Sequence, residues 1–173
     1  MKTLVIHPKD HSTDFLSTIY EDKPSWHIIN LDVSNKILKN EISRHDRIII
    51  MGHGTPMGLL GYGRYVITPK FVYLLRDLNK KYVFIWCNAN KFIEKYYLHG
   101  FYTGMIISEM REAYYCGIRT TNAEINFSNF LFADSIKKSI DLDDFYKNVI
   151  LYYDNYIQFN PIILFNKKNI YER

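Results

Sequence analysis

The chain has 173 residues, of which 47% are apolar and 23% charged, and its mean hydropathy is −0.21. This composition predicts one globular domain over residues 1–173 and excludes a disordered chain. The modest net charge of +4 is scattered along the sequence, so we expect no nucleic-acid-binding face.

The sequence predicts neither a membrane span nor a secretory signal. No apolar run reaches the roughly 18 residues of a membrane span, and the first residues lack a long apolar stretch followed by a cleavage site. The two cysteines lie in apolar surroundings, which argues for a reducing compartment and against a disulfide framework. We therefore expect a cytoplasmic protein, whose oligomeric state the sequence leaves open.

The first part of the chain predicts strands and helices that lead to a central strand. Short β-branched runs indicate strands at residues 3–6 and 26–31. Helices are expected at residues 14–20 and 35–43. The continuous apolar run at residues 48–51 is typical of a strand covered on both faces of a sheet.

A glycine-containing segment follows this strand and leads to a second central strand. Residues 52–54 (Gly-His-Gly) end the first strand, and residues 57–67 predict a β-hairpin. Thr68-Pro69 is a typical start of a helix, with the cap at Thr68. The apolar run at residues 82–86 then predicts the second central strand, which ends at Cys87.

After residues 87–89 we expect one or two helices, of which the clearer is near residues 103–111, then a strand at 113–118 and a helix at 126–140. Residues 142–155 have a helical period, and residues 161–165 indicate a last strand. This order of elements favours an α/β fold. We expect a three-layer sandwich with a mainly parallel central sheet, helices on both faces and a small β-hairpin insertion.

Two reactive side chains follow the two central strands. His53 lies between glycines, which let the backbone turn sharply and approach a ligand. Cys87 lies at the mouth of its strand, and a cysteine thiolate is a nucleophile that a nearby imidazole can activate. Each residue alone also fits a structural role. If the two strands are neighbours, however, both side chains emerge at one sheet edge, where ligands of parallel sheets bind.

This part of the chain resembles the caspase-like cysteine peptidases, the clan that includes caspases, gingipains, clostripain, legumain and CHAT domains. The resemblance rests on residues 48–54 (Ile-Ile-Ile-Met-Gly-His-Gly), the hairpin, the helix at Thr68-Pro69, and residues 83–89 (Val-Phe-Ile-Trp-Cys-Asn-Ala). It extends over about residues 1–140 and includes the expected strand at 113–118. In that clan a His-Gly pair follows one strand and the cysteine follows the next.

The resemblance implies a cysteine endopeptidase that hydrolyses a peptide bond in a specific protein substrate, without a cofactor or metal. It assigns Cys87 as the nucleophile and His53 as the proton donor to the leaving amine. The backbone N–H groups of Gly54 and Cys87 would form the oxyanion hole.

The resemblance also places a pocket for the first substrate residue in the loop at residues 118–122. Arg119 in that loop would favour an acidic substrate residue, and Glu124 a basic one. The candidate substrate-binding residues are Arg119, Thr120, Asn122, Glu124 and His7, the last because it ends the first strand.

Two alternatives remain open. One is a caspase-like domain that binds a peptide or small ligand without cutting it. It is favoured by residues 88–90 (Asn-Ala-Asn), where active members have small residues or glycine, and by the lack of an evident acidic partner for His53. The other is a Rossmann-like nucleotide-binding protein, although no Gly-x-Gly-x-x-Gly motif follows the first strand. No zinc site is predicted, since neither Cys87 nor Cys116 has a second cysteine nearby.

Overall fold

The computed structural model describes residues 1–156 and 160–173. The described residues divide into two compact units. The first consists of Met1–His11, Lys23–Met105 and Tyr171–Arg173, and the second of Ser12–Asp22 and Ile106–Ile170. The expectation of one domain over residues 1–173 stays a prediction.

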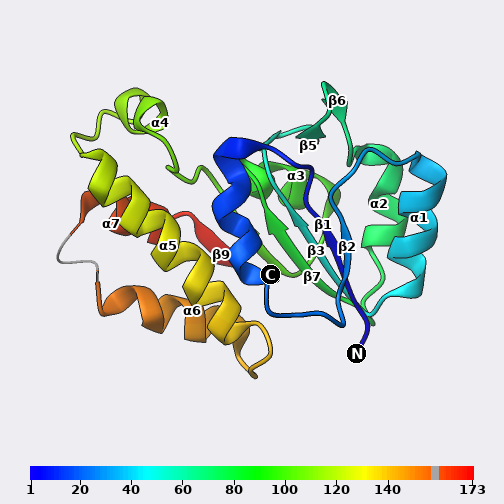
Figure 1. Ribbon diagram of the computed structural model, residues 1–173. Coiled ribbons are helices and arrows are strands. Elements are labelled where there is room, and N and C mark those ends of the chain that lie inside the picture. The colour runs from blue at the N-terminus through cyan, green and yellow to red at the C-terminus, as the bar shows by residue number, and fades with distance from the viewer. Residues whose placement is uncertain (157–159) are drawn as a thin grey trace. The chain divides into compact units, whose positions relative to one another are not determined.

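Within the described ranges, six strands form a central sheet in the order β2-β1-β3-β7-β8-β9 (Figure 1). Their bounds are β1 Thr3–Ile6, β2 His27–Ile29, β3 Arg47–Met51, β7 Lys81–Ile85, β8 Phe101–Thr103 and β9 Ile170–Glu172. The pairs β1–β2, β1–β3, β3–β7 and β7–β8 are parallel. Gly100 and Arg173 exchange both backbone hydrogen bonds, as residues of an antiparallel pair do. The predicted α/β fold with a mainly parallel sheet is therefore confirmed.

The two central strands are the continuous apolar runs of the sequence. Every residue of β3 is buried, and so is every residue of β7 after Lys81. Strands that are covered on both faces read as unbroken apolar runs rather than alternating ones. They pair directly, with Met51 opposite Ile85, so the expectation that they are neighbours is confirmed.

Helices α1 (Asn35–Arg44), α2 (Val72–Leu75) and α3 (Ala89–Tyr96) bury their apolar sides against one face of this sheet. The shared core contains the strand residues Leu4, Ile6, Ile48, Ile50, Tyr82, Phe84 and Trp86 and the helix residues Leu38, Ile42, Leu75, Phe92 and Ile93. Each of these larger side chains stabilises the fold by roughly 1.5–3 kcal/mol through its burial. Ser34 caps α1 by accepting a hydrogen bond from Ile37 N–H, and this cap sets where the helix begins.

The segment after β3 forms a separate small antiparallel sheet of β4 (Gly54–Thr55), β5 (Gly58–Gly61) and β6 (Arg64–Tyr65) (Figure 1). The turn between β5 and β6 consists of Tyr62 and Gly63, both with positive φ (54° and 72°). Positive φ at both positions is the signature of the two-residue type I′ turn, which matches the twist of a hairpin. The predicted hairpin is confirmed. Beyond it, Thr68 caps the short 3-10 helix η2 (Pro69–Phe71) that leads into α2.

The second unit is helical in its described residues. It contains most of the 3-10 helix η1 (His11–Ile19), and α4 (Met110–Tyr115), α5 (Asn122–Ser139), α6 (Phe145–Asp154) and α7 (Pro161–Lys167). Helices α5, α6 and α7 contact one another. The predicted helices at 126–140 and 142–155 are α5 and α6. Across the described ranges, no helix combines the length and apolar character that crossing a bilayer requires.

The expected strand at residues 113–118 is wrong, because this segment lies in α4 and the turn after it. Glu109 and Glu112 form a capping box that starts the helix, and Gly117 with φ of 68° follows its end. A short apolar run does not distinguish a strand from a buried helix, so the capping residues decided the outcome.

Two further expectations in this half are wrong. Residues 161–165 form a helix rather than a strand, because Asn160 accepts a hydrogen bond from Ile162 N–H and Pro161 occupies the first helical turn. The helix expected at residues 103–111 is absent from the described structure: β8 ends at Thr103 and α4 begins only at Met110. The strand that follows β7 in the chain is therefore β8.

Candidate functional site

His53 and Cys87 follow neighbouring strand ends at the carboxyl edge of the central sheet. Met51 of β3 and Ile85 of β7 are register partners, and each candidate residue comes two positions after one of them. Gly52 N–H donates to Ile85 O at 3.0 Å, so the pairing continues to the residue before His53. The parallel register therefore delivers a histidine and a cysteine to the same edge, as the sequence pattern predicted.

Trp86 joins the two strand ends. Its indole Nε1–H donates to Thr55 O at 3.1 Å. A Cβ atom at Gly54 would lie 2.1 Å from Trp86 Cδ1, a distance that real side chains do not reach. Only glycine fits after His53, because the residue before Cys87 packs directly on its backbone. The close packing of Trp86 therefore requires glycine at position 54, which belongs to the Gly-His-Gly motif of the sequence.

The N–H of Gly54 points away from the hairpin ladder. Leu60 N–H donates to His53 O at 2.8 Å, which makes these two residues a hydrogen-bonded pair of the antiparallel ladder. Gly54 is the next residue along and is paired with Leu59 in the same register. Hydrogen-bonded and non-hydrogen-bonded pairs alternate, so the N–H of Gly54 is directed outward, where it can bind an anionic oxygen.

Asp10 is an acidic neighbour of His53 that the sequence did not reveal. Its Oδ1 lies 3.5 Å from His53 Nε2, and both side chains are about half exposed. Asp10 follows β1, which is the sheet neighbour of β3, so the two loops leave the sheet side by side. Only the pairing of β1 with β3 could have indicated this contact, because the two residues lie far apart in the sequence.

An open pocket of about 450 Å³ adjoins His53. It is bounded by residues 8–10 after β1 and residues 60–64 of the hairpin, with Lys9, Asp10 and Arg64 as its charged members. Arg64 is held by Asp32 at 2.5 Å and by Val33 O at 3.0 Å. Cys87 is not one of the described residues that line this pocket.

Cys87 lies in the turn between β7 and α3 and is partly buried. Thr103 donates its hydroxyl to Trp86 O at 3.0 Å, and Asn88 N–H donates to Gly104 O at 3.0 Å, so bonds hold the chain on both sides of the cysteine. Asn88 has a φ of 65° and precedes the first residue of α3. Asparagine tolerates this left-handed conformation better than most residues, which gives Asn88 a structural reason to be there.

Asn90 adds a polar atom near the start of α3. Its side-chain Oδ1 is buried and has no hydrogen-bond partner among the described residues. A buried acceptor without a donor costs free energy unless a water or a ligand satisfies it. Because Asn90 lies three residues after Cys87, its Oδ1 is suited to accept a hydrogen bond from a molecule bound near the cysteine.

Of the other predicted substrate residues, His7 lies at the same carboxyl edge of the sheet, whereas the other four lie outside the first unit. His7 is buried at the end of β1, where its N–H donates to Ile29 O. Arg119, Thr120, Asn122 and Glu124 belong to the second unit. The loop at 118–122 follows α4 rather than the strand after the cysteine, so the topological reason for choosing these residues is removed. Their role in substrate binding stays a prediction.

Glu124 is engaged in capping α5. Its carboxylate accepts hydrogen bonds from Thr121 N–H at 2.8 Å and from the hydroxyl of Thr120 at 3.0 Å. These bonds, the backbone one first, hold the pKa of Glu124 below its ordinary value. At Cys116, burial and the neighbouring Glu112 raise the pKa of the thiol, which makes it a poorer nucleophile at neutral pH than an ordinary cysteine.

The carboxyl edge of the first unit thus combines a thiol, an imidazole beside a carboxylate, and an outward backbone N–H next to a pocket. These groups can supply a nucleophile, a proton donor and an oxyanion donor for acyl transfer. In comparisons with known proteins, no family model, no curated protein and no solved structure matches this chain.

Proposed function

We propose that the chain is a cysteine endopeptidase of caspase-like type, in which Cys87 and His53 hydrolyse a peptide bond of a protein substrate. The observation that carries the proposal is the in-register pairing of β3 with β7, which places the two residues after adjacent strand ends. A His-Gly pair after one strand and a cysteine after the next is the arrangement of the clan that the sequence resembles. The three-layer sandwich of that clan is part of the proposal.

The chemistry follows from the groups at this edge. The Cys87 thiolate attacks the carbonyl carbon of the scissile bond, and the resulting oxyanion is bound by the N–H groups of Gly54 and Cys87. His53 donates a proton to the leaving amine as the carbon–nitrogen bond breaks, leaving a thioester. A water molecule, deprotonated by His53, then attacks the thioester, so that the carboxylate product leaves and the thiol is restored.

Asp10 has a positioning role in this proposal. A carboxylate 3.5 Å from Nε2 favours one orientation of the imidazole ring, although exposed ion pairs of this kind contribute little to stability. The pocket next to His53 offers room for substrate residues beside the scissile bond. The proposed nucleophile, proton donor and oxyanion donors all belong to the first unit.

Covalent labelling tests the proposal. A peptidyl electrophile such as a peptidyl chloromethyl ketone is incubated with the full chain, and the modified cysteine is identified by mass spectrometry of proteolytic fragments. We expect modification at Cys87, loss of labelling in Cys87→Ala and His53→Ala, and unchanged labelling in the matched control Cys116→Ala. Modification at Cys116 alone contradicts the proposal.

A non-catalytic domain that binds a peptide is favoured by one observation. Cys87 is not among the described residues that line the 450 Å³ pocket, whereas His53 is, so a ligand can occupy this pocket without meeting the thiol. Thermal stabilisation by peptides, without any cleavage product over long incubation, supports this alternative. Turnover that disappears in Cys87→Ala excludes it.

A further inference from the structure

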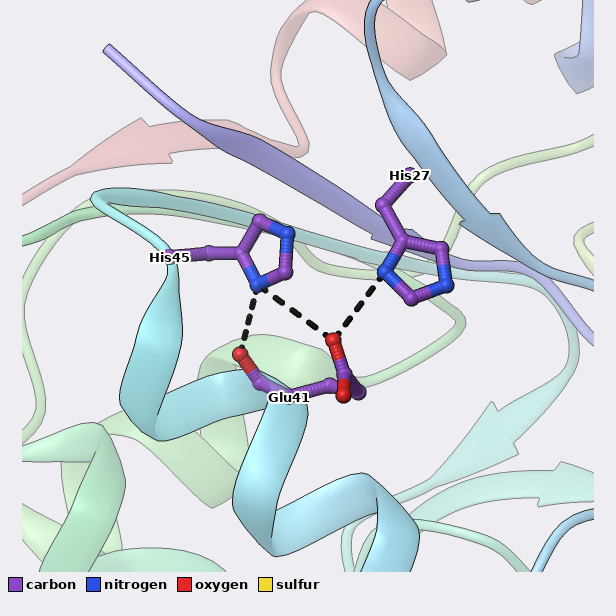
Figure 2. A group of neighbouring side chains, drawn as sticks. All are labelled: His27, Glu41 and His45. Atoms are coloured by element: carbon purple, nitrogen blue, oxygen red, sulfur yellow. Dashed lines mark hydrogen bonds and ion pairs between the residues drawn. The ribbon is translucent and has the colours of Figure 1, made fainter.

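A second cluster of side chains lies at the amino edge of the central sheet, away from the strand ends that lead to His53 and Cys87. His27 is the first residue of β2, and His45 lies two residues before β3 begins at Arg47. Glu41 is in the last turn of α1, and His45 is the residue that caps the end of this helix, so its ring nitrogen reaches the backbone oxygen of Glu41. Figure 2 shows both imidazole rings and the Glu41 carboxylate turned toward one another. We propose that these three side chains bind a zinc ion.

The distances within the cluster suit a metal ion. His27 Nδ1 lies 3.0 Å from Glu41 Oε2, and one ligand atom from each of the three residues lies within 4.8 Å of the others. With zinc–ligand bonds of about 2.0–2.1 Å, tetrahedral ligand atoms are about 3.4 Å apart. Rotations of the side chains are therefore needed to bring all three donors to the spacing of zinc ligands. Two imidazoles and one carboxylate are also a donor set that zinc commonly takes.

Hydrogen bonds orient two of these ligands. His45 Nδ1 lies 2.7 Å from the backbone oxygen of Glu41, which only a protonated Nδ1 can bond. The lone pair of His45 is then on Nε2, and a histidine held in this way through its other nitrogen is the usual form of a metal ligand. Asn40 donates to Glu41 Oε1 at 3.3 Å, so the other carboxylate oxygen, Oε2, is the one beside the histidines.

The end of α1 is held in place by Lys80. Its ammonium group donates to the backbone oxygens of Ile42, Ser43 and His45 at 2.7–2.9 Å. These oxygens are at the negative end of the helix and otherwise lack partners within it. The segment that carries Glu41 and His45 is therefore preorganised, and binding a metal does not have to order it.

Exposure and shape indicate an open site rather than a closed structural one. The side chains of Glu41 and His45 are 16% and 11% exposed, whereas that of His27 is 48% exposed. A pocket of about 200 Å³ begins at His27 and Glu41 and continues between aliphatic side chains such as Ile29 and Ile37. Three protein ligands leave a fourth position for water or a small ligand from this pocket. The chemistry of the site is thus that of zinc with an exchangeable ligand.

Zinc titration of the full chain tests the proposal. The measurement uses the Cys87→Ala, Cys116→Ala variant after chelator treatment, so that thiolates do not compete and the result is independent of the proposed peptidase. We expect one zinc per chain by calorimetry, and a zinc X-ray absorption spectrum with two imidazole ligands. The changes His27→Gln and Glu41→Gln should each weaken zinc binding at least about tenfold.

His53→Gln in the same background is the matched control, because His53 also lies beside a carboxylate but at the other edge of the sheet. It should leave the zinc affinity unchanged. His27 is half exposed, so His27→Gln should keep the circular dichroism spectrum of the parent. The proposal is overturned if no stoichiometric zinc binds, or if His27→Gln binds zinc as tightly as the parent, which would leave only a hydrogen-bonded cluster.

Discussion

At the carboxyl edge of the first unit, polar side chains gather beyond the ends of strands, whereas in the second unit Glu124 and Asn160 bond to the ends of helices. His53 and Asp10 meet beyond β3 and β1, and Gly54 directs its N–H outward. In the second unit, by contrast, Glu124 caps α5 and Asn160 caps α7. The difference teaches that a polar residue in a loop indicates chemistry only when no nearby helix end uses it.

Asn166 of the second unit is another polar side chain that hydrogen-bonds the backbone. Its buried side chain accepts a hydrogen bond from Ile107 N–H and donates to Ile107 O, at 2.8 and 2.9 Å. It also donates to the hydroxyl of Ser128 at 3.1 Å. A buried amide that satisfies a loop backbone in this way replaces regular secondary structure there.

The largest effect on peptide cleavage is expected for the substitution Cys87→Ala. If the first unit performs the chemistry, the rate of peptide cleavage falls by at least about 1,000-fold, because no other group at this edge can form the thioester. Initial rates with a peptide library, at matched folded fractions, measure the loss. Cys116→Ala should retain the parental rate; a loss of the same size in Cys116→Ala contradicts the assignment.

Gly54→Ala tests whether the packing of Trp86 joins the two strand ends. The added methyl group would overlap the indole, since its carbon would lie 2.1 Å from Trp86 Cδ1, and overpacking of this severity costs about 3 kcal/mol. Urea unfolding measures the free energy. Gly63→Ala is the control, because no atom lies within 4 Å of its added methyl group and only the strain of its φ of 72° remains, roughly 1 kcal/mol. Equal losses in the two variants would contradict the packing explanation.

Zinc should stabilise the first unit if the amino edge binds metal. At a free zinc concentration about 100 times the dissociation constant, linkage predicts about 2.7 kcal/mol, which corresponds to a rise in Tm of about 5–10 °C. Differential scanning calorimetry of the cysteine-free variant measures the shift. His27→Gln should remove it while His53→Gln retains it; a shift that persists in His27→Gln points to another site.

The substitution Asp10→Asn tests whether this carboxylate positions His53 or binds the substrate. A positioning carboxylate that is half exposed should change kcat by about tenfold and KM little, because it acts on the imidazole rather than on bound substrate. Steady-state kinetics separate the two parameters. The free energy of unfolding should change by less than about 0.5 kcal/mol. A rise in KM at constant kcat would instead place Asp10 in substrate binding.

The smallest effect is expected for Glu124→Gln in the second unit. The pKa of Glu124 is lower in the folded chain than its ordinary value of 4.5, so the carboxylate stabilises the fold above pH 4.5 and this contribution is lost as the pH falls through the folded pKa. Urea unfolding should show a small loss of stability in Glu124→Gln at pH 7 that diminishes as the pH falls below 4.5. If Glu124→Gln instead weakens cleavage after basic substrate residues and leaves the free energy of unfolding unchanged, Glu124 binds the substrate as the sequence predicted.

Elements whose formation depends on interactions between residues close in the sequence were predicted correctly more often than the others. The apolar runs that became β3 and β7 carry their own signal, and so do Tyr62-Gly63 and Thr68-Pro69, because turn and capping preferences act over a few residues. The strands expected at residues 113–118 and 161–165 are wrong because short apolar runs fit a strand or a helix equally well. The capping residues that start these helices, Glu109 and Asn160, lie outside the runs.

The α/β class, the central strands and the positions of His53 and Cys87 after them could be predicted from the amino-acid sequence. Which side chains meet depends instead on how the strands and helices pack together. Asp10 reaches His53 through the pairing of β1 with β3, and His27 reaches Glu41 through the docking of α1 beside β2. Such contacts join residues that are distant in the chain, and the free energy that selects them is spread over the whole core rather than over a local motif.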